Sequence, residues 1–213
     1  MKRRVVLLGP PGAGKGTQAR VLALRLGVPH VSTGDLFRWH VSQETPLGRK
    51  AREYLERGLL VPDEITVSMV AEKMDGRGFV LDGFPRNLAQ ARALEEILRR
   101  RGEELDAALL LEVPEEELVE RLSGRRVCAV CGRNYHLRFQ PPPGGRCSCG
   151  GELLEREDDR EEVVRRRIRV YREETSPLVE FYEGRGKLIR VDGLGDPDEV
   201  SSRILAALSL DPV

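Results

Sequence analysis

Apolar residues along the chain fall into two patterns, short unbroken runs and longer stretches in which they recur every three or four positions. The runs have the length and composition of buried strands, and the stretches have the period of amphipathic helices. The predicted strands are 5–8, 28–32, 79–82, 107–113 and 187–191, and the predicted helices are 18–26, 36–57, 62–74, 87–101, 115–123 and 197–208. Because strands and helices alternate, we expect an α/β fold with a parallel sheet covered by helices on both faces.

Proline and glycine divide this pattern further. Helix 36–57 is interrupted at Thr45-Pro46, where proline suits the first turn of a new helix, and it ends at Gly58, a residue that often closes helices. The last helix has Asp196 as its cap and Pro197 in its first position. Between 124 and 159 the alternation stops, and this stretch contains three consecutive prolines and all four cysteines, so we expect a small inserted domain there.

The overall composition is that of a globular protein with one sizeable core. Of the 213 residues, 40% are hydrophobic and 33% are charged, and 35 acidic residues balance 35 basic ones. Proteins that bind nucleic acid or a membrane surface usually need a dominant basic field, so the zero net charge argues against both. Lys2-Arg3-Arg4 precedes an apolar run too short for a signal peptide or a membrane span, and we therefore expect a cytoplasmic protein.

A glycine-rich stretch, GPPGAGKGT at 9–17, links the first predicted strand to the first predicted helix. This order is the setting of a phosphate-binding loop, in which glycines let backbone N–H groups surround an anion at the positive end of a helix. Lys15 adds a mobile charge and is one of only five lysines. Gly16 separates Lys15 from Thr17, which indicates a sub-class of P-loop proteins. A glycine-rich turn without a ligand is the alternative.

A second candidate site follows the third predicted strand. Ligands of open α/β sheets bind at the carboxyl ends of strands, and Asp82 at this end is placed to hold Mg²⁺ or its water molecules. Gly83 and Pro85 are expected to fix a turn that aims Arg86 inward, with Gln90 one helical turn beyond. The alternative is an exposed charge pair at a strand end.

One arginine in the charged stretch 158–173 differs from its neighbours. Several arginines there have a carboxylate four residues away, and Arg165 with Glu161 is one such pair. This spacing is typical of a solvated helix face. Arg167 has only valines and a tyrosine three and four residues away, and so lacks a local acidic partner. A guanidinium among apolar side chains needs an anion from elsewhere, either a ligand or a distant Asp or Glu.

The four cysteines, Cys128, Cys131, Cys147 and Cys149, lie close together in the expected insertion. A loop-rich insertion of this size buries too little core to fold unaided, and a structural zinc ion held by four thiolates would supply the missing stability. Disulfides are disfavoured in a reducing cytoplasm, and free thiols are the other alternative. The first pair has the usual C-x2-C spacing, whereas the second is C-x-C, which puts ligation by one of the second pair in doubt.

Four motifs together resemble the adenylate kinase family, in its bacterial form with a long, zinc-containing lid. They are residues 9–17, Ser32–Arg38, Asp82–Arg86 and Gly124–Cys128, in order and with compatible spacing along essentially the whole chain. The resemblance implies a P-loop three-layer fold with a five-stranded parallel sheet. It also implies a helical insertion that binds the nucleoside monophosphate at 33–61, a lid at 124–161, and a core of 1–32, 62–123 and 162–213.

The resemblance further implies the conversion of Mg·ATP and AMP to two ADP, and the residues that perform it. The implied AMP site consists of Thr33, Arg38, Leu59, Leu60, Val61, Gly83, Phe84, Pro85, Arg86, Gln90, Arg156 and Arg167. The implied ATP site consists of Gly12, Ala13, Gly14, Lys15, Gly16, Thr17, Arg121, Arg125, Asn134, Tyr135 and Gly195. Phosphoryl transfer would depend on Lys15, Asp82, Arg125, Arg156 and Arg167. Asp82 and Asp35 would order the water molecules of Mg²⁺, and the four cysteines would bind Zn²⁺.

Other functions stay open at this stage. A kinase for UMP, CMP or GMP would share the fold and the chemistry. A nucleotide-gated RNA-binding protein would use the insertion to grip RNA, although that insertion offers few aromatic residues for stacking. A P-loop GTPase is less favoured, because no guanine-specificity element follows. We expect a monomer that serves nucleotide homeostasis, with ATP, AMP and ADP as ligands and no nucleic-acid or membrane partner.

Overall fold

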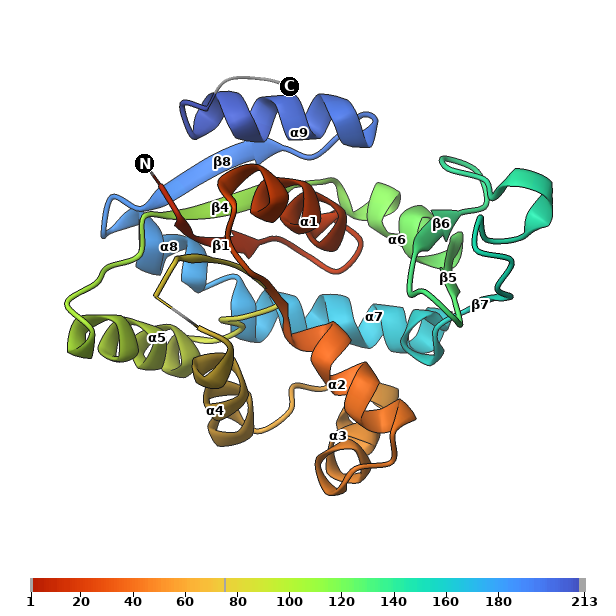
Figure 1. Cartoon of the computed structure of the whole chain (residues 1–213), viewed down its shortest axis with the longest axis horizontal. Helices are drawn as coiled ribbons and strands as arrows, with labels where there is room; N and C mark the ends of the chain where they lie inside the picture. Colours follow the sequence, from red (N-terminus) through yellow and green to blue (C-terminus); the bar gives the residue numbers. More distant parts are fainter. Residues whose placement is uncertain (1, 75, 211–213) are drawn as a thin grey trace.

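The computed structural model describes residues 2–74 and 76–210, and a five-stranded sheet forms its centre (Figure 1). The strands are β1 (Arg4–Leu8), β2 (His30–Ser32), β3 (Phe79–Asp82), β4 (Ala107–Glu112) and β8 (Leu188–Asp192), in the order β2-β3-β1-β4-β8. Every neighbouring pair is parallel. The predicted α/β fold is confirmed, and each core strand lies within two residues of its predicted bounds.

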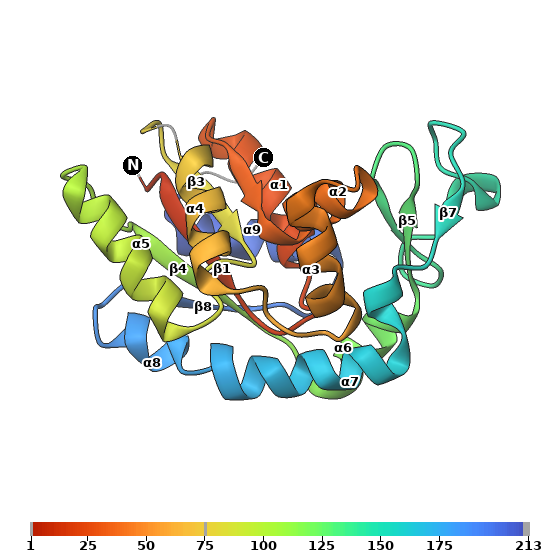
Figure 2. The same cartoon turned by 90° about the horizontal axis from the view of Figure 1, so that it is seen from below.

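Helices cover both faces of the sheet because its strands are apolar on both sides. Val5 and Leu7 of β1 belong to a core cluster completed by α1 (Lys15–Leu26) and α9 (Pro197–Ala207). Val6 and Leu8 belong to a second cluster, completed by α4 (Asp63–Lys73), α5 (Leu88–Arg100) and α8 (Leu178–Glu183). Since side chains alternate along a strand, an unbroken apolar run fills both cores, and three layers result (Figures 1 and 2).

The helices agree with the prediction apart from a few differences, one of them at α2 (Thr33–Ser42), which begins three residues before its predicted start. α1 begins at Lys15, three residues before its predicted start, so it rises directly from the glycine loop. The charged stretch forms α7 (Glu161–Val170), which continues into a π-helical turn, η3 (Tyr171–Thr175). The pattern of apolar residues predicts neither η3 nor the short helix α8. No helix in the described ranges has the length and apolar character needed to cross a membrane.

Two helices project beside the end of β2. α2 (Thr33–Ser42) and α3 (Pro46–Glu56) meet at the predicted break, where Gly48 N donates to Thr45 Oγ1 at 3.0 Å and so caps α3. The helices approach closely at Gly48, since a Cβ there would lie 1.9 Å from the carbonyl oxygen of His40. Phe37, Ala51, Val61 and Met69 form a separate small core under these helices.

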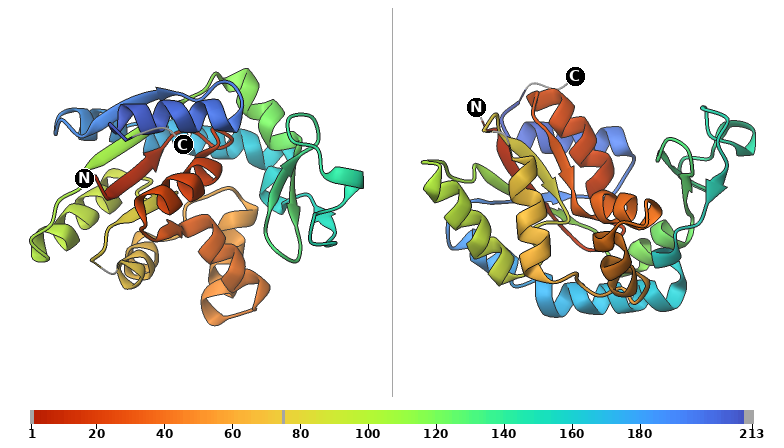
Figure 3. Two further views of the ribbon diagram at one scale, coloured as in Figure 1. Left: turned by 45° about the horizontal axis from the view of Figure 1, so that its top comes forward. Right: turned by 60° about the horizontal axis from the view of Figure 1, so that its bottom comes forward.

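The cysteine-rich stretch forms a second addition to the sheet, between α6 (Glu115–Ser123) and α7. It contains an antiparallel sheet of β5 (Arg125–Cys128), β6 (Asn134–His136) and β7 (Leu153–Leu154), together with the 3₁₀ turns η1 (Pro143–Gly145) and η2 (Glu157–Asp159). Its buried core consists of Cys128, Tyr135 and Cys147. Figure 3 shows this addition and the α2–α3 pair on the same side of the molecule. Residues 1, 75 and 211–213 of the expected core ranges lie outside the described residues.

Candidate active site

The loop after β1 contains three glycines in backbone conformations that favour glycine. Gly9, Gly12 and Gly14 have φ angles of 139°, 90° and 88°, a region that residues with a Cβ rarely adopt. A Cβ on Gly9 would also lie 2.8 Å from the carbonyl oxygen of Leu111. α1 starts directly after Gly14, so the free N–H groups of its first turn point into the loop, as an anion site requires.

Lys15 folds back over this loop. Its Nζ donates to the carbonyl oxygens of Gly9 and Pro10, at 2.7 and 2.9 Å. Burial lowers the pKa of Lys15 to about 8, and the positive charges of Arg86 and Arg167 add to this effect, while Asp82 opposes it. The ammonium therefore lies in a region that is already positive and would gain from a bound anion.

Asp82, at the end of β3, faces the start of α1. A Cβ on Gly16 would lie 3.2 Å from Asp82 Oδ2, which explains why glycine follows the P-loop lysine here. Burial raises the pKa of Asp82, but His30 and Lys15 outweigh it and lower that pKa below its usual value. His30 Nε2 lies 3.9 Å from Asp82 Oδ2. A buried, ionised carboxylate beside a phosphate loop is a suitable holder of a divalent cation through water.

Arg167 has acidic partners, and they are eight and nine positions away, outside the helical spacing in which the sequence offers none. Its Nη1 lies 3.1 Å from Asp158 Oδ2 and 3.1 Å from Asp159 Oδ1, on the turn η2 just before α7. Asp159, whose side chain is fully buried, also accepts from Arg125 Nε at 2.7 Å. Of the two alternatives, the structure shows the carboxylate pairing, and it also places Arg167 on the wall of the cleft. Two carboxylates thus hold Arg125 and Arg167 in fixed positions.

The other arginines of the site are buried with little compensation. Burial and the charge of Arg167 lower the pKa of Arg86 to about 10. Burial and the charges of Arg38 and Arg125 lower the pKa of Arg156 to about 9. Positive charges held close together in this way destabilise one another until an anion binds between them.

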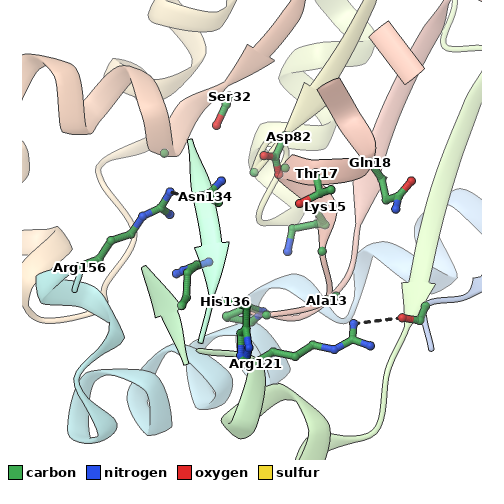
Figure 4. Close-up of a pocket in the computed structure, with 18 of the residues that line it drawn as sticks. Ala13, Lys15, Thr17, Gln18, Ser32, Asp82, Arg121, Asn134, His136 and Arg156 are labelled. Atoms are coloured by element: carbon green, nitrogen blue, oxygen red, sulfur yellow. Dashed lines mark hydrogen bonds between the residues drawn. The ribbon is translucent and has the colours of Figure 1, made fainter. Parts of the chain in front are cut away.

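These groups line one cleft of about 540 Å³, a volume typical of small-molecule sites. The cleft contains every residue of the implied ATP site, together with Arg38, Asp35, Asp82, Arg156 and Arg167 of the implied AMP, metal and transfer groups. Figure 4 shows Lys15 and Asp82 on the sheet side and Arg156 across from them, where Arg156 Nη2 donates to Asn134 Oδ1 at 2.7 Å. Arg121 Nη1 donates to Gly193 O at 3.1 Å.

A smaller cavity of about 20 Å³ opens beside α2. The implied AMP residues that line it are Thr33, Leu59, Leu60, Val61, Gly83, Arg86 and Gln90. Phe84 and Pro85 are buried but line neither cavity, so the structure does not bring them to the site. Gln90 is held by the protein itself, since its Oε1 accepts from Arg86 N at 2.8 Å and its Nε2 donates to Asp63 Oδ1 at 2.7 Å.

Several residues that line the cleft were not predicted from the sequence as site residues. His136 and Phe139, from the cysteine-rich addition, stack with ring centroids 4.4 Å apart and line the cleft next to Arg121. Asp158 lines it as well, and Arg167 and Arg38 lower its pKa to about 2 although burial opposes them. Asp158 and Asp159 begin the charged stretch of the sequence. Nothing in their spacing distinguishes them from acidic residues that cap a helix.

The four cysteines form one cluster, with their Sγ atoms within 4.8 Å of one another. Sγ atoms of a tetrahedral zinc site lie about 3.8 Å apart, given Zn–S bonds of about 2.3 Å. Here Cys128 and Cys149 lie 3.5 Å apart, as do Cys131 and Cys147, so the C-x-C spacing does not prevent either residue from joining. The hydroxyl of Tyr135 points into this cluster and donates to Cys147 Sγ at 3.3 Å. The backbone N–H of Cys149 and this hydroxyl lower the pKa of Cys147 to about 6, which favours the metal-binding thiolate.

The cleft thus combines a P-loop lysine with several arginines, as expected of a P-loop enzyme that transfers phosphoryl groups between nucleotides. Comparison with known proteins narrows this class, because the family model described as "Adenylate kinase" matches residues 7–187. The chain belongs to the adenylate kinase family, and as a member of it is an ATP:AMP phosphotransferase.

Curated relatives agree along nearly the whole chain. It is 49% identical to an adenylate kinase of Clostridium botulinum (strain Eklund 17B / Type B), over 96% of the chain and 98% of that protein. It is 50% identical to an adenylate kinase of Streptomyces avermitilis, over 96% of each. An adenylate kinase of Acetivibrio thermocellus is 51% identical, over 97% of the chain and 98% of that protein.

Proposed function

We propose that the chain transfers a phosphoryl group reversibly from Mg·ATP to AMP, giving two ADP, and so balances the adenine nucleotides of the cytoplasm. The observation that carries this proposal is the single cleft in which Lys15 meets Arg38, Arg86, Arg125, Arg156 and Arg167. One nucleoside phosphate would not need so many positive charges. Two phosphate chains meeting end to end would use all of them.

ATP is proposed to bind on the P-loop side of the cleft. Residues 12–17 would surround its β- and γ-phosphates with backbone N–H groups, and Lys15 would leave the carbonyl oxygens of Gly9 and Pro10 to follow them. Arg121, Asn134, Tyr135 and Gly195 would bind the rest of the nucleotide. His136 and Phe139 add an aromatic surface suited to stacking on a base.

AMP is proposed to bind on the side of α2 and α3. Its base would lie against Leu59–Val61 and Gln90, with Thr33 and Gly83 as the adjoining wall, and the smaller cavity, which has room for about one water molecule, would widen to admit it. Arg38 and Arg86 would bind its phosphate. Arg38 Nη2 donates to Asp35 Oδ1 at 2.7 Å, so phosphate would replace a carboxylate as the partner of this guanidinium.

The transfer itself requires alignment and neutralisation of charge rather than a covalent intermediate. A metaphosphate-like group in flight carries its charge on peripheral oxygens, and preorganised donors around it lower the barrier. Lys15, Arg125, Arg156 and Arg167 would supply these donors. Because Asp158 and Asp159 fix two of them before the substrates arrive, little reorganisation accompanies the reaction.

Magnesium and zinc would have separate roles. Asp82, which the P-loop environment keeps ionised, would hold Mg²⁺ through water, with Asp35 contributing once Arg38 has turned to the phosphate. When bound with ATP, Mg²⁺ neutralises charge on the phosphate oxygens. Zn²⁺ held by Cys128, Cys131, Cys147 and Cys149 would stabilise the fold of the lid and take no part in the reaction.

We also propose that residues 33–61 and 124–161 act as an AMP-binding insertion and a lid that close over the substrates. Closure would exclude water and limit hydrolysis of ATP. Nucleic acid and membranes have no part in this proposal, and one chain contains all the residues that it needs, in keeping with a monomer.

The proposal is tested by measuring ADP formation by the purified protein with Mg·ATP and, separately, AMP, CMP, UMP and GMP. We expect turnover with AMP to be at least a hundred times faster than with the other three monophosphates. This turnover should be lost when Mg²⁺ is chelated. Faster turnover with another monophosphate would show that the enzyme prefers a different acceptor for the same phosphoryl transfer. Absence of ADP with all four would overturn the proposal.

A further inference from the structure

The π-helical turn η3 between α7 and α8 has no role in the site as described so far. In it, Ser176 N donates to Tyr171 O at 2.8 Å, a bond that spans five residues instead of four. Pro177 explains why the α-helix is interrupted here, because proline lacks an N–H and its ring would collide with the carbonyl group four residues earlier. Such turns are rare and occur frequently at functional sites.

The turn brings one hydroxyl to the proposed AMP site. Thr175, the last residue of η3, donates from Oγ1 to the carbonyl oxygen of Arg86 at 2.7 Å, across 89 positions of the sequence. Each helical residue advances the side-chain direction by about 100°, so the additional residue of a π turn decides which side chain faces Arg86. The contact therefore depends on the irregularity of the helix.

Arg86 is held at three points. Its N–H donates to Gln90 Oε1 and its Nε donates to Gly83 O, both at 2.8 Å. These two bonds lie within the segment 83–90 and move with it. The bond from Thr175 ties the segment to a different element, the helix that also carries Arg167.

The charges around Arg86 explain why it needs such a tie. Arg86 and Arg167 both line the cleft, and the charge of Arg167 is, after burial, the largest cause of the lowered pKa of Arg86. Two like charges in a site of low dielectric repel, so a displaced backbone at Arg86 would let its guanidinium move away from Arg167. Fixing the carbonyl group of Arg86 keeps its guanidinium in place before AMP arrives.

We propose that Thr175 is a positioning residue for the AMP phosphate site, and that it acts through the backbone of Arg86. The inference rests on the proposed function of Arg86. The π turn would then set the distance between two arginines. Arg167 lies on α7, and η3, which continues α7, holds the backbone of Arg86.

The test compares Thr175→Val, which keeps the shape and removes the hydroxyl, with Thr175→Ser, which keeps the hydroxyl. Ser176→Ala is the matched control, because Ser176 Oγ donates to Arg172 O at 2.6 Å in the same turn without touching Arg86. For each variant the KM values for AMP and ATP, kcat, the Kd for AMP by calorimetry and the thermal midpoint are measured. Thr175→Ala is added in case the valine variant does not fold.

Thr175→Val is expected to raise the KM and Kd for AMP about tenfold, or about 1.4 kcal/mol, and to leave the KM for ATP within about twofold. Thr175→Ser should retain AMP binding within about threefold, and Ser176→Ala should not change it. Equal losses for ATP and AMP, unchanged AMP binding in Thr175→Val, or the same loss in Ser176→Ala would overturn the inference. Arg86→Lys separates the two proposals, since an unchanged KM for AMP in that variant would remove the function of Arg86 itself.

Discussion

The low pKa of Lys15 makes the affinity for ATP depend on pH. Burial and neighbouring arginines lower its pKa to about 8 in the free protein, and phosphate beside the ammonium would raise that pKa again. Below pH 8 the lysine is already charged when ATP arrives. Above pH 8 it is neutral, so ATP binding must take up a proton and the affinity for ATP falls as the pH rises.

Calorimetry in buffers of different ionisation enthalpy measures this proton uptake directly. We expect about 0.9 proton per ATP at pH 9 and almost none at pH 6.5 from this residue, as a group with a pKa of about 8 requires. Arg156, with a pKa of about 9, contributes to the total, so the comparison is with Lys15→Met. Equal uptake by the wild type and Lys15→Met at pH 9 would contradict the account.

Which residues the sequence could predict depends on how local their environment is. The P-loop residues and Asp82 lie next to strands whose pattern is plain, and the structure places them in the cleft as expected. The sequence could not decide between a ligand and a distant carboxylate as the partner of Arg167, because the turn η2 carries Asp158 and Asp159 back over α7, which no helical spacing reveals. His136 and Phe139 were missed because their contact with the cleft depends on how the whole addition is oriented.

Among the elements, the small sheet β5–β6–β7 has the least apolar core to support it. Its buried residues are Cys128, Tyr135 and Cys147, with Leu153 packed against them. We therefore expect this unit to depend on a bound metal ion for its stability. Loss of a structural metal ion lowers the free energy of unfolding by several kcal/mol. Removing one bound metal per chain should therefore lower the thermal midpoint by roughly 10 °C or more.

The measurement is calorimetric unfolding before and after removal of metal, with metal content determined by elemental analysis. Readdition of Zn²⁺ should restore the midpoint. Cys149→Ser tests the short C-x-C spacing and should lose part of the same stability. A protein that contains no metal as purified, or that has the same midpoint after chelation, would contradict the structural function of the cysteine cluster.

Element by element, the sequence predicted the core better than the additions. Core strands and helices have strong periodic signals, since each must bury one face or both. β6 and β7 contain three and two residues, too few to show alternation. The sequence does not predict α8, because the π turn before it disrupts the helical period and α8 itself has only six residues.

At the scale of the whole molecule, the end of the α2–α3 pair rests on α7. Gly58, with a φ of 66°, is so close that a Cβ would lie 2.9 Å from Cγ of Arg167. Gly58→Ala should therefore push the pair away from α7 and raise the KM for AMP about fivefold or more, in addition to a backbone cost of about 1 kcal/mol.

Gly27→Ala provides the matched control. Gly27 has a φ of 64° but nothing within 4 Å of its Cβ position, so alanine there adds backbone strain alone. The two variants should lose similar stability in urea unfolding, and only Gly58→Ala should weaken AMP binding. If both change the KM for AMP equally, contact between these parts of the molecule does not determine AMP binding.

The central claim is that two nucleotides occupy one cleft at once and exchange phosphate directly. Initial rates of ADP formation, measured while Mg·ATP and AMP are both varied, test this claim most directly. We expect double-reciprocal lines that intersect, as a ternary complex requires, and no phosphorylated protein after incubation with labelled ATP alone. Parallel lines, together with label retained on the protein, would show a covalent intermediate and contradict it.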